Sequence, residues 1–120
     1  MAVQNYRQHV AWQRAMDLAA ASYRVTSGLP PSEQFGLTFQ VRKAAVSVPS
    51  NIAEGHGRGT PKAMSNFVRI ANGSTNELET QLMLAERLGF LSGTDVAPVL
   101  DLAGEVGRLL TGLRRSLERQ

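Results

Sequence analysis

Apolar residues recur every three or four positions along most of this 120-residue sequence, which is the spacing of one face of an α-helix. No segment alternates apolar and polar residues over the length of a strand, and no turn dipeptide separates two such segments. The pair Asn72-Gly73 is typical of a turn, but it falls within a helical repeat, so we expect it inside a helix. The pattern predicts an all-α protein.

The first apolar segment predicts a helix over residues 10–27, because Gly28 and the pair Pro30-Pro31 follow it and proline cannot continue a helix. Its apolar residues form two neighbouring stripes, one of Trp12, Met16, Ala19 and Tyr23 and one of Ala11, Ala15, Leu18 and Val25. Since Trp12 and Tyr23 keep helical spacing with the other apolar residues, we expect both in the core rather than in a cofactor site.

The second segment predicts a helix that begins near Leu37 and ends at Gly55. Its apolar stripe consists of Leu37, Val41, Ala44, Val48 and Ile52. Pro49 lies within this segment and has no N–H to donate to the carbonyl of Ala45, so we expect the helix to kink there.

The third segment has clear signals at both ends. Thr60 can cap a helix, Pro61 suits its first position, and Gly89 is a plausible stop. The predicted stripe is Met64, Phe67, Ala71, Ser74, Leu78, Leu82 and Ala85.

The fourth segment has the strictest repeat. We expect Asp95 to cap it and Pro98 to lie in its first turn. Its stripe has heptad spacing and consists of Val96, Val99, Ala103, Val106, Leu110, Leu113 and Leu117. Leucines that flank this stripe widen the apolar face of the helix. The extra width serves either the interior of the bundle or a subunit interface. Short connections between long helices then predict one domain over residues 1–120, an antiparallel up-down-up-down four-helix bundle.

Composition and charge limit the classes of function that the protein can have. The sequence has no cysteine, which excludes disulfides and thiolate-bound metal. The net charge of +3 comes from the first 60 residues, with six Lys and Arg against three Asp and Glu. This excess is modest, but copies in a homo-oligomer would add their charges. No apolar stretch is long enough for a signal peptide or a bilayer span, so we expect a cytoplasmic protein with no membrane partner.

Five basic residues are candidates for binding nucleic acid: Arg42, Lys43, Arg58, Lys62 and Arg69. Solvated helix faces carry such charges routinely, which is the alternative interpretation. Because aromatic residues that could stack on bases are not interleaved with them, we expect contacts to phosphate that are tolerant of sequence and sensitive to salt.

Two further segments have polar candidates. Ser47, Asn51, Glu54, Asn76 and Glu77 form either a small polar pocket or, as we favour, interhelical hydrogen bonds that fix register, since an unpaired buried polar group costs roughly 1–3 kcal/mol. The segment 55–60 precedes a helix start and is either a plain loop or an anion site with Arg58 and Lys62.

Catalytic motifs are missing from the sequence. It contains no Glu-x-x-His pair of the di-iron type, no His-Glu-x-x-His and no Gly-x-Ser-x-Gly. His9 and His56 are the two histidines, and neither is placed as a base or ligand in such a motif. We therefore expect no enzyme, no catalytic or metal site and no cofactor.

The run Ser47-Val48-Pro49-Ser50-Asn51-Ile52-Ala53-Glu54-Gly55 is a specific motif. It is accompanied by Leu29-Pro30, Glu33, Phe35-Gly36-Leu37, Gln40, Arg42, Arg58, Phe67, Ile70-Ala71, Gly73-Ser74 and Glu77-Leu78-Glu79. With these residues, the segment from about Val10 to Leu91 resembles the bacterial four-helix-bundle family of ribosomal RNA intervening-sequence proteins, which includes the accessory variability protein of diversity-generating retroelements.

The resemblance implies an all-helical homopentamer and, in the retroelement branch, nucleic-acid binding beside a reverse transcriptase. We therefore expect a non-enzymatic oligomer whose repeated basic surface binds RNA or DNA, with further copies of itself and a reverse transcriptase as expected partners. The alternative is a protein-binding scaffold bundle that makes no nucleic-acid contact.

Overall fold

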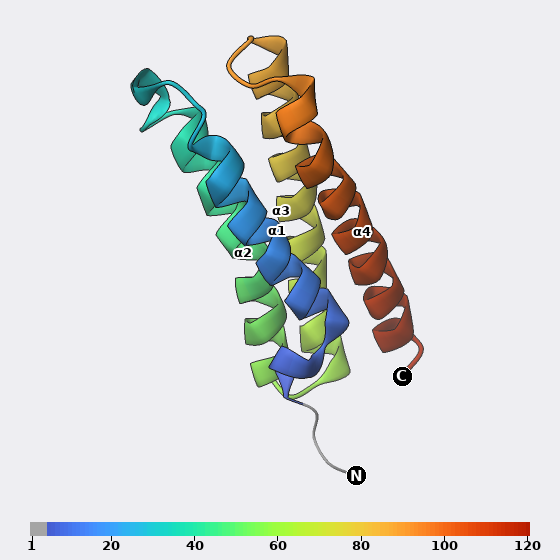
Figure 1. The fold of residues 1–120 in the computed structure, drawn as a ribbon. Helices are drawn as coiled ribbons and strands as arrows, with labels where there is room; N and C mark the ends of the chain where they lie inside the picture. Colours follow the sequence, from blue (N-terminus) through green and yellow to red (C-terminus); the bar gives the residue numbers. More distant parts are fainter. Residues whose placement is uncertain (1–4) are drawn as a thin grey trace.

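The computed structural model describes residues 5–120, and four long helices account for most of them (Figure 1). The long helices are α1 (Val10–Thr26), α2 (Leu37–Gly57), α3 (Pro61–Arg87) and α4 (Gly93–Glu118). Two short 3-10 helices precede α1 and α2: η1 (Tyr6–Gln8) and η2 (Pro31–Glu33). No strand occurs within residues 5–120, so the predicted all-α four-helix bundle is confirmed.

Each helix lies beside two others. Helix α1 contacts α2 and α4, and α3 contacts the same two helices. Figure 1 shows the α1–α2 and α3–α4 connections at one end of the bundle and the α2–α3 connection at the other, near the start of α1 and the end of α4. We call these the two-loop end and the one-loop end.

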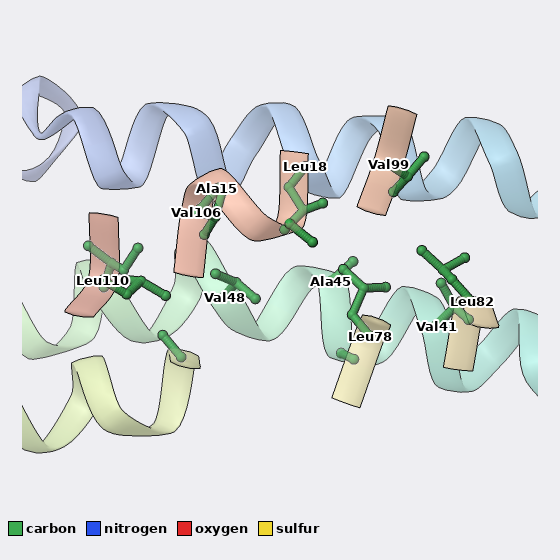
Figure 2. Close-up of a cluster of buried hydrophobic side chains, with 14 of the residues drawn as sticks. Ala15, Leu18, Val41, Ala45, Val48, Leu78, Leu82, Val99, Val106 and Leu110 are labelled. Carbon is green, nitrogen blue, oxygen red and sulfur yellow. The ribbon is translucent and has the colours of Figure 1, made fainter. Parts of the chain in front are cut away.

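The core runs along the whole bundle axis and receives side chains from all four long helices. Figure 2 shows buried side chains of all four helices spread along the bundle, among them Leu18, Val48, Leu78 and Leu110. The heptad stripe predicted for the fourth helix is buried from Val96 to Leu110, and its last two leucines are partly buried.

Helix α1 buries only one of its two predicted stripes. Ala11, Ala15 and Leu18 are buried, whereas Tyr23 of the other stripe is 43% exposed. The expected core position of Tyr23 is therefore wrong, and Trp12 is half-buried. The reason is size, because the small residues of the buried stripe allow α1 to approach its neighbours closely.

Helix α2 continues without interruption through Pro49, which is buried. It ends at Gly57, two residues later than expected, so the loop expected over residues 55–60 is shorter. The kink at Pro49 stays a prediction.

Capping interactions satisfy both ends of α3. Thr60 Oγ1 accepts a hydrogen bond from Ala63 N at 3.2 Å, as expected for the start of α3. At its other end Gly89 has a φ of +78° and donates to Glu86 O, while Phe90 N donates to Ala85 O. These two bonds satisfy the last carbonyls of α3 in a Schellman motif.

The cap expected for the fourth helix is wrong. Ser92 caps α4, because its Oγ accepts from Asp95 N at 3.0 Å and its backbone is extended. Asp95 itself lies in the first turn, where a carboxylate is favoured by the helix dipole. Pro98 is consequently inside α4 and beyond its first turn. Within residues 5–120, no helix combines the length and apolar character needed to cross a membrane.

Candidate nucleic-acid interface

Arg42 is engaged in holding the end of α1. Its Nε donates to Thr26 Oγ1 at 2.9 Å and its Nη2 to Tyr23 O at 3.3 Å. The guanidinium also lies over the Tyr23 ring, 4.6 Å from its centroid. Because the last carbonyls of a helix need donors and favour a cation, Arg42 serves the C-terminus of α1.

The five basic candidates do not form one surface. Arg42 and Lys43 lie near the two-loop end, whereas Arg58 follows the last residue of α2 at the one-loop end. The helical rise over the 16 positions from Arg42 to Arg58 corresponds to about 24 Å. Lys62 and Arg69 lie in the first half of α3 and therefore, like Arg58, toward the one-loop end.

An open groove of about 460 Å³ lies between α1 and α2 at the two-loop end. Arg42 and Lys43 line it together with Tyr23, Phe39 and Val46. The two aromatic rings and Val46 are each more than two-fifths exposed. This groove is therefore largely apolar despite its two cations.

Arg58 is turned back onto its own helix pair. Its Nη2 lies 2.9 Å from Glu54 Oε1, and its guanidinium is 5.1 Å from the centroid of the Phe67 ring. Only residues 58–60 connect α2 and α3. The Thr60 hydroxyl caps α3 in this connection.

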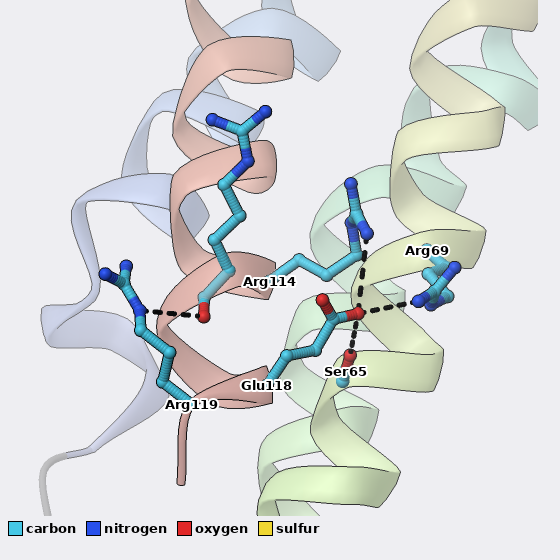
Figure 3. Close-up of polar contacts among 6 residues, drawn as sticks. Ser65, Arg69, Arg114, Glu118 and Arg119 are labelled. Atoms are coloured by element: carbon cyan, nitrogen blue, oxygen red, sulfur yellow. Dashed lines mark hydrogen bonds and ion pairs between the residues drawn. The ribbon is translucent and has the colours of Figure 1, made fainter.

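The α3–α4 side of the one-loop end gathers more cations than the sequence predicted. Glu118 Oε1 accepts from Arg69 Nη2 at 2.6 Å, from Arg114 Nη1 at 3.4 Å and from Ser65 Oγ at 3.5 Å (Figure 3). Lys62 lines a groove of about 290 Å³ with Ser65, Arg69 and Glu118.

Two more arginines continue this surface on α4. Arg119 donates from its Nε to Arg115 O at 3.2 Å, and both residues line a second groove with Glu118. We call the set the terminal cation cluster: Lys62, Arg69, Arg114, Arg115 and Arg119. Arg114, Arg115 and Arg119 are not among the candidates predicted from sequence, because the apolar repeat of the fourth helix does not report on its charged residues.

Glu118 is the carboxylate at the centre of this cluster. Partial desolvation raises its pKa, but the hydrogen bond from Arg69 and the charges of Arg114 and Arg69 outweigh that effect. The pKa of Glu118 therefore lies below its ordinary value, and the carboxylate is ionised at neutral pH.

The polar motif of α2 is a link to α3. Ser47 Oγ lies 2.8 Å from Ser74 Oγ, and Asn51 Nδ2 donates to Ser47 O at 2.7 Å and to Ser47 Oγ at 2.8 Å. This geometry is that of a hydrogen-bonded contact between helices. The other members of the motif, Glu54, Asn76 and Glu77, are exposed and do not join it.

A cluster of rings closes the one-loop end near the start of α1. The His9 and His56 centroids are 5.8 Å apart, and Tyr6 lies 6.2 Å from His56 and 5.5 Å from Trp12. Desolvation and, secondarily, the charge of His56 lower the pKa of His9. In residues 5–120, no group of three or more His, Cys, Asp or Glu side chains is arranged to hold a metal ion.

A family profile described as 23S rRNA-intervening sequence protein matches residues 7–112. The chain belongs to this family. No curated protein matches it. The family name associates its members with intervening sequences of 23S rRNA.

The family match covers the first three helices and most of α4. All five basic candidates of the sequence lie inside it. Within this member of the intervening-sequence family, Arg114, Arg115, Glu118 and Arg119 lie beyond the last matched residue. The terminal cation cluster therefore combines residues from inside and outside the matched segment.

Proposed function

We propose that this intervening-sequence family member is a non-enzymatic, self-associating helical bundle in the cytoplasm that binds the phosphate backbone of RNA or DNA. The observation that carries the proposal is the terminal cation cluster, in which two arginines bind the carboxylate of Glu118 and three further cations line the grooves beside it. Exposed arginine and lysine side chains on one face give sequence-tolerant binding that weakens as salt rises.

Self-association is supported by a second surface. Met16 and Tyr23 of α1 and Phe39 and Val46 of α2 are each between 43% and 51% exposed. Contiguous exposed apolar side chains of this kind mark interaction sites. A further copy of the chain is the proposed occupant, and the resemblance to the pentameric family suggests five copies.

The binding test measures fluorescence anisotropy of a labelled single-stranded RNA oligomer over a series of salt concentrations. We expect binding at low salt that falls steeply as salt rises. A variant with Lys62→Gln, Arg115→Gln and Arg119→Gln should lose about 2 units of the log–log salt slope, since each single-strand phosphate contact contributes about 0.7.

The matched control replaces three exposed arginines outside the cluster: Arg24→Gln, Arg87→Gln and Arg108→Gln. It changes the net charge by the same amount and should keep most of the slope. Equal losses in the two variants would show that net charge alone attracts the RNA, and no binding at low salt would refute the proposal.

Assembly is tested separately by sedimentation velocity. We expect a species larger than a monomer, and we expect Met16→Glu with Val46→Glu to shift it toward a monomer with unchanged helix content.

A second candidate function, a protein-binding scaffold, is favoured by the α1–α2 groove and by Phe35, which is 86% exposed. Retained assembly with no RNA or DNA binding, or capture of a reverse transcriptase alone, would favour that candidate.

A further inference from the structure

One oxygen of Glu118 accepts from three donors on two helices. Arg69 and Ser65 of α3 and Arg114 of α4 all point to Oε1 (Figure 3). Two guanidinium groups and a hydroxyl are also the donors that proteins use for a phosphate oxygen. The carboxylate therefore occupies a position that suits a phosphate.

Glu118 is held there by its arginine partners and not by its own helix. It is the last residue of α4, where the negative end of the helix dipole disfavours a carboxylate. Its side chain is 39% exposed and that of Arg69 is 58% exposed. Exposed ion pairs of this kind are weak and screened by salt, so a competing anion can displace the carboxylate.

The surroundings can accommodate a longer polyanion. The groove beside Glu118 is lined by Lys62 and Asn66 as well as by Arg69, and it extends toward Pro61 at the start of α3. Arg115 and Arg119 line a second groove that also includes Glu118. A nucleic-acid strand whose phosphate replaced the carboxylate would have further cations in both grooves.

We propose that Glu118 occupies a phosphate subsite of the terminal cation cluster and competes with the nucleic-acid backbone for Arg69 and Arg114. The carboxylate thereby limits affinity, and binding requires it to leave the two arginines. This inference rests on the proposed nucleic-acid binding and adds a named subsite and an internal competitor to it.

The test compares the full chain with its Glu118→Gln variant in the anisotropy assay with labelled single-stranded RNA. Glutamine keeps the size of the side chain and removes its charge. We expect RNA affinity to rise about two- to fivefold for each arginine released, the range of one exposed ion pair. The salt slope should steepen by about 0.7 for each new phosphate contact.

Glu105→Gln is the matched control. Glu105 also pairs with an arginine of another helix, Arg14 of α1, so the control removes one charge from a comparable ion pair outside the cluster. We expect its affinity and slope to remain close to those of the unmodified chain. Adding Arg69→Gln to Glu118→Gln should remove the part of the gain that comes from Arg69, because Arg114 is then the one remaining arginine that the carboxylate releases.

The outcomes separate the two proposals. RNA binding with the same affinity and slope in the chain and in Glu118→Gln would overturn the subsite and leave nucleic-acid binding intact. An equal gain in Glu105→Gln would assign the effect to net charge and would also overturn the subsite. No RNA binding by any of these proteins would overturn both proposals.

Discussion

Gly55 provides a sharp test of the packing between α2 and α3. A Cβ added to this glycine would lie 2.7 Å from Phe67 Cβ and 2.9 Å from Met64 Sδ. The Phe67 Cβ is fixed to the backbone of α3 and cannot rotate away, so Gly55→Ala must push the two helices apart. Overpacking of this kind costs about 1–3 kcal/mol.

Helix propensity opposes this cost but does not cancel it. Replacing a glycine in a helix interior by alanine stabilises by up to about 1 kcal/mol, and less in a last turn such as that of Gly55. We therefore expect Gly55→Ala to lower the free energy of unfolding by about 1–2 kcal/mol. That change corresponds to a fall of about 3–10 °C in Tm for a chain of this size.

Two other helical glycines are matched controls. A Cβ added to Gly73 in α3 or to Gly112 in α4 meets no atom within 4 Å. The same substitution there should raise the free energy of unfolding by about 0.5–1 kcal/mol. The sign of the effect therefore depends on the packing around each glycine and not on the substitution itself.

Chemical denaturation followed by circular dichroism measures these differences. All variants must be compared at one protein concentration, because the proposed assembly would make the apparent stability concentration-dependent. A Gly55→Ala variant as stable as the unmodified chain would refute the close approach of α2 and α3. Loss of stability in Gly73→Ala would instead indicate that a partner covers the outer face of α3.

Three further predictions concern the cap, the core and pH. Ser92→Ala removes the cap of α4 and should lower the free energy of unfolding by about 0.5–2 kcal/mol in the same assay. Leu78→Ala, at a fully buried position, should lower it by about 2–5 kcal/mol. In the folded chain the pKa of His9 lies below the ordinary 6.5, so the unfolded chain binds more protons. The free energy of unfolding should therefore fall as pH drops below 6.5. His9→Gln should reduce this dependence in measurements of Tm over a series of pH values.

Each of these three predictions would be contradicted by a specific result. If Asp95→Ala cost more than Ser92→Ala, the serine would not be the main cap. A loss below about 1 kcal/mol in Leu78→Ala would mean that the core relaxes around it. A His9→Gln variant with the same pH profile as the unmodified chain would assign acid sensitivity to other groups.

The helices were predictable because their signals are local. Periodicity over many turns and the chemistry at Thr60, Pro61 and Gly89 depend only on residues near each other in sequence. The wrong cap predicted for the fourth helix also has a local cause. Ser92 and Asp95 are both good caps, and the extended backbone that selects Ser92 is set by the tight turn after α3.

Burial within α1 could not be settled from its sequence. Its two neighbouring stripes are both apolar, and the choice depends on how closely other helices approach. The structure buries the stripe of Ala15 and Leu18 and exposes the one of Met16 and Tyr23. Polar Ser22 and Thr26 extend the buried stripe because each hydroxyl donates to a carbonyl in its own helix.

The candidate site was only partly predictable, because its contacts are long-range in sequence. Arg69 and Glu118 are 49 positions apart, and only the side-by-side packing of α3 and α4 brings them together. The available local signal was the density of arginines at the end of the chain, with Arg114 four positions before Glu118.

The two surfaces behind the proposed function lie on different helices. The exposed apolar side chains proposed for assembly belong to α1 and α2, whereas the terminal cation cluster belongs to α3 and the end of α4. Assembly through the first surface would leave the second available to nucleic acid in every copy. Arg42 fits this division, because its contacts with Thr26 and the Tyr23 carbonyl already satisfy much of its guanidinium. Substitution of Arg42 should therefore weaken α1 and assembly more than RNA binding. Substitutions in the terminal cation cluster should weaken RNA binding more than assembly.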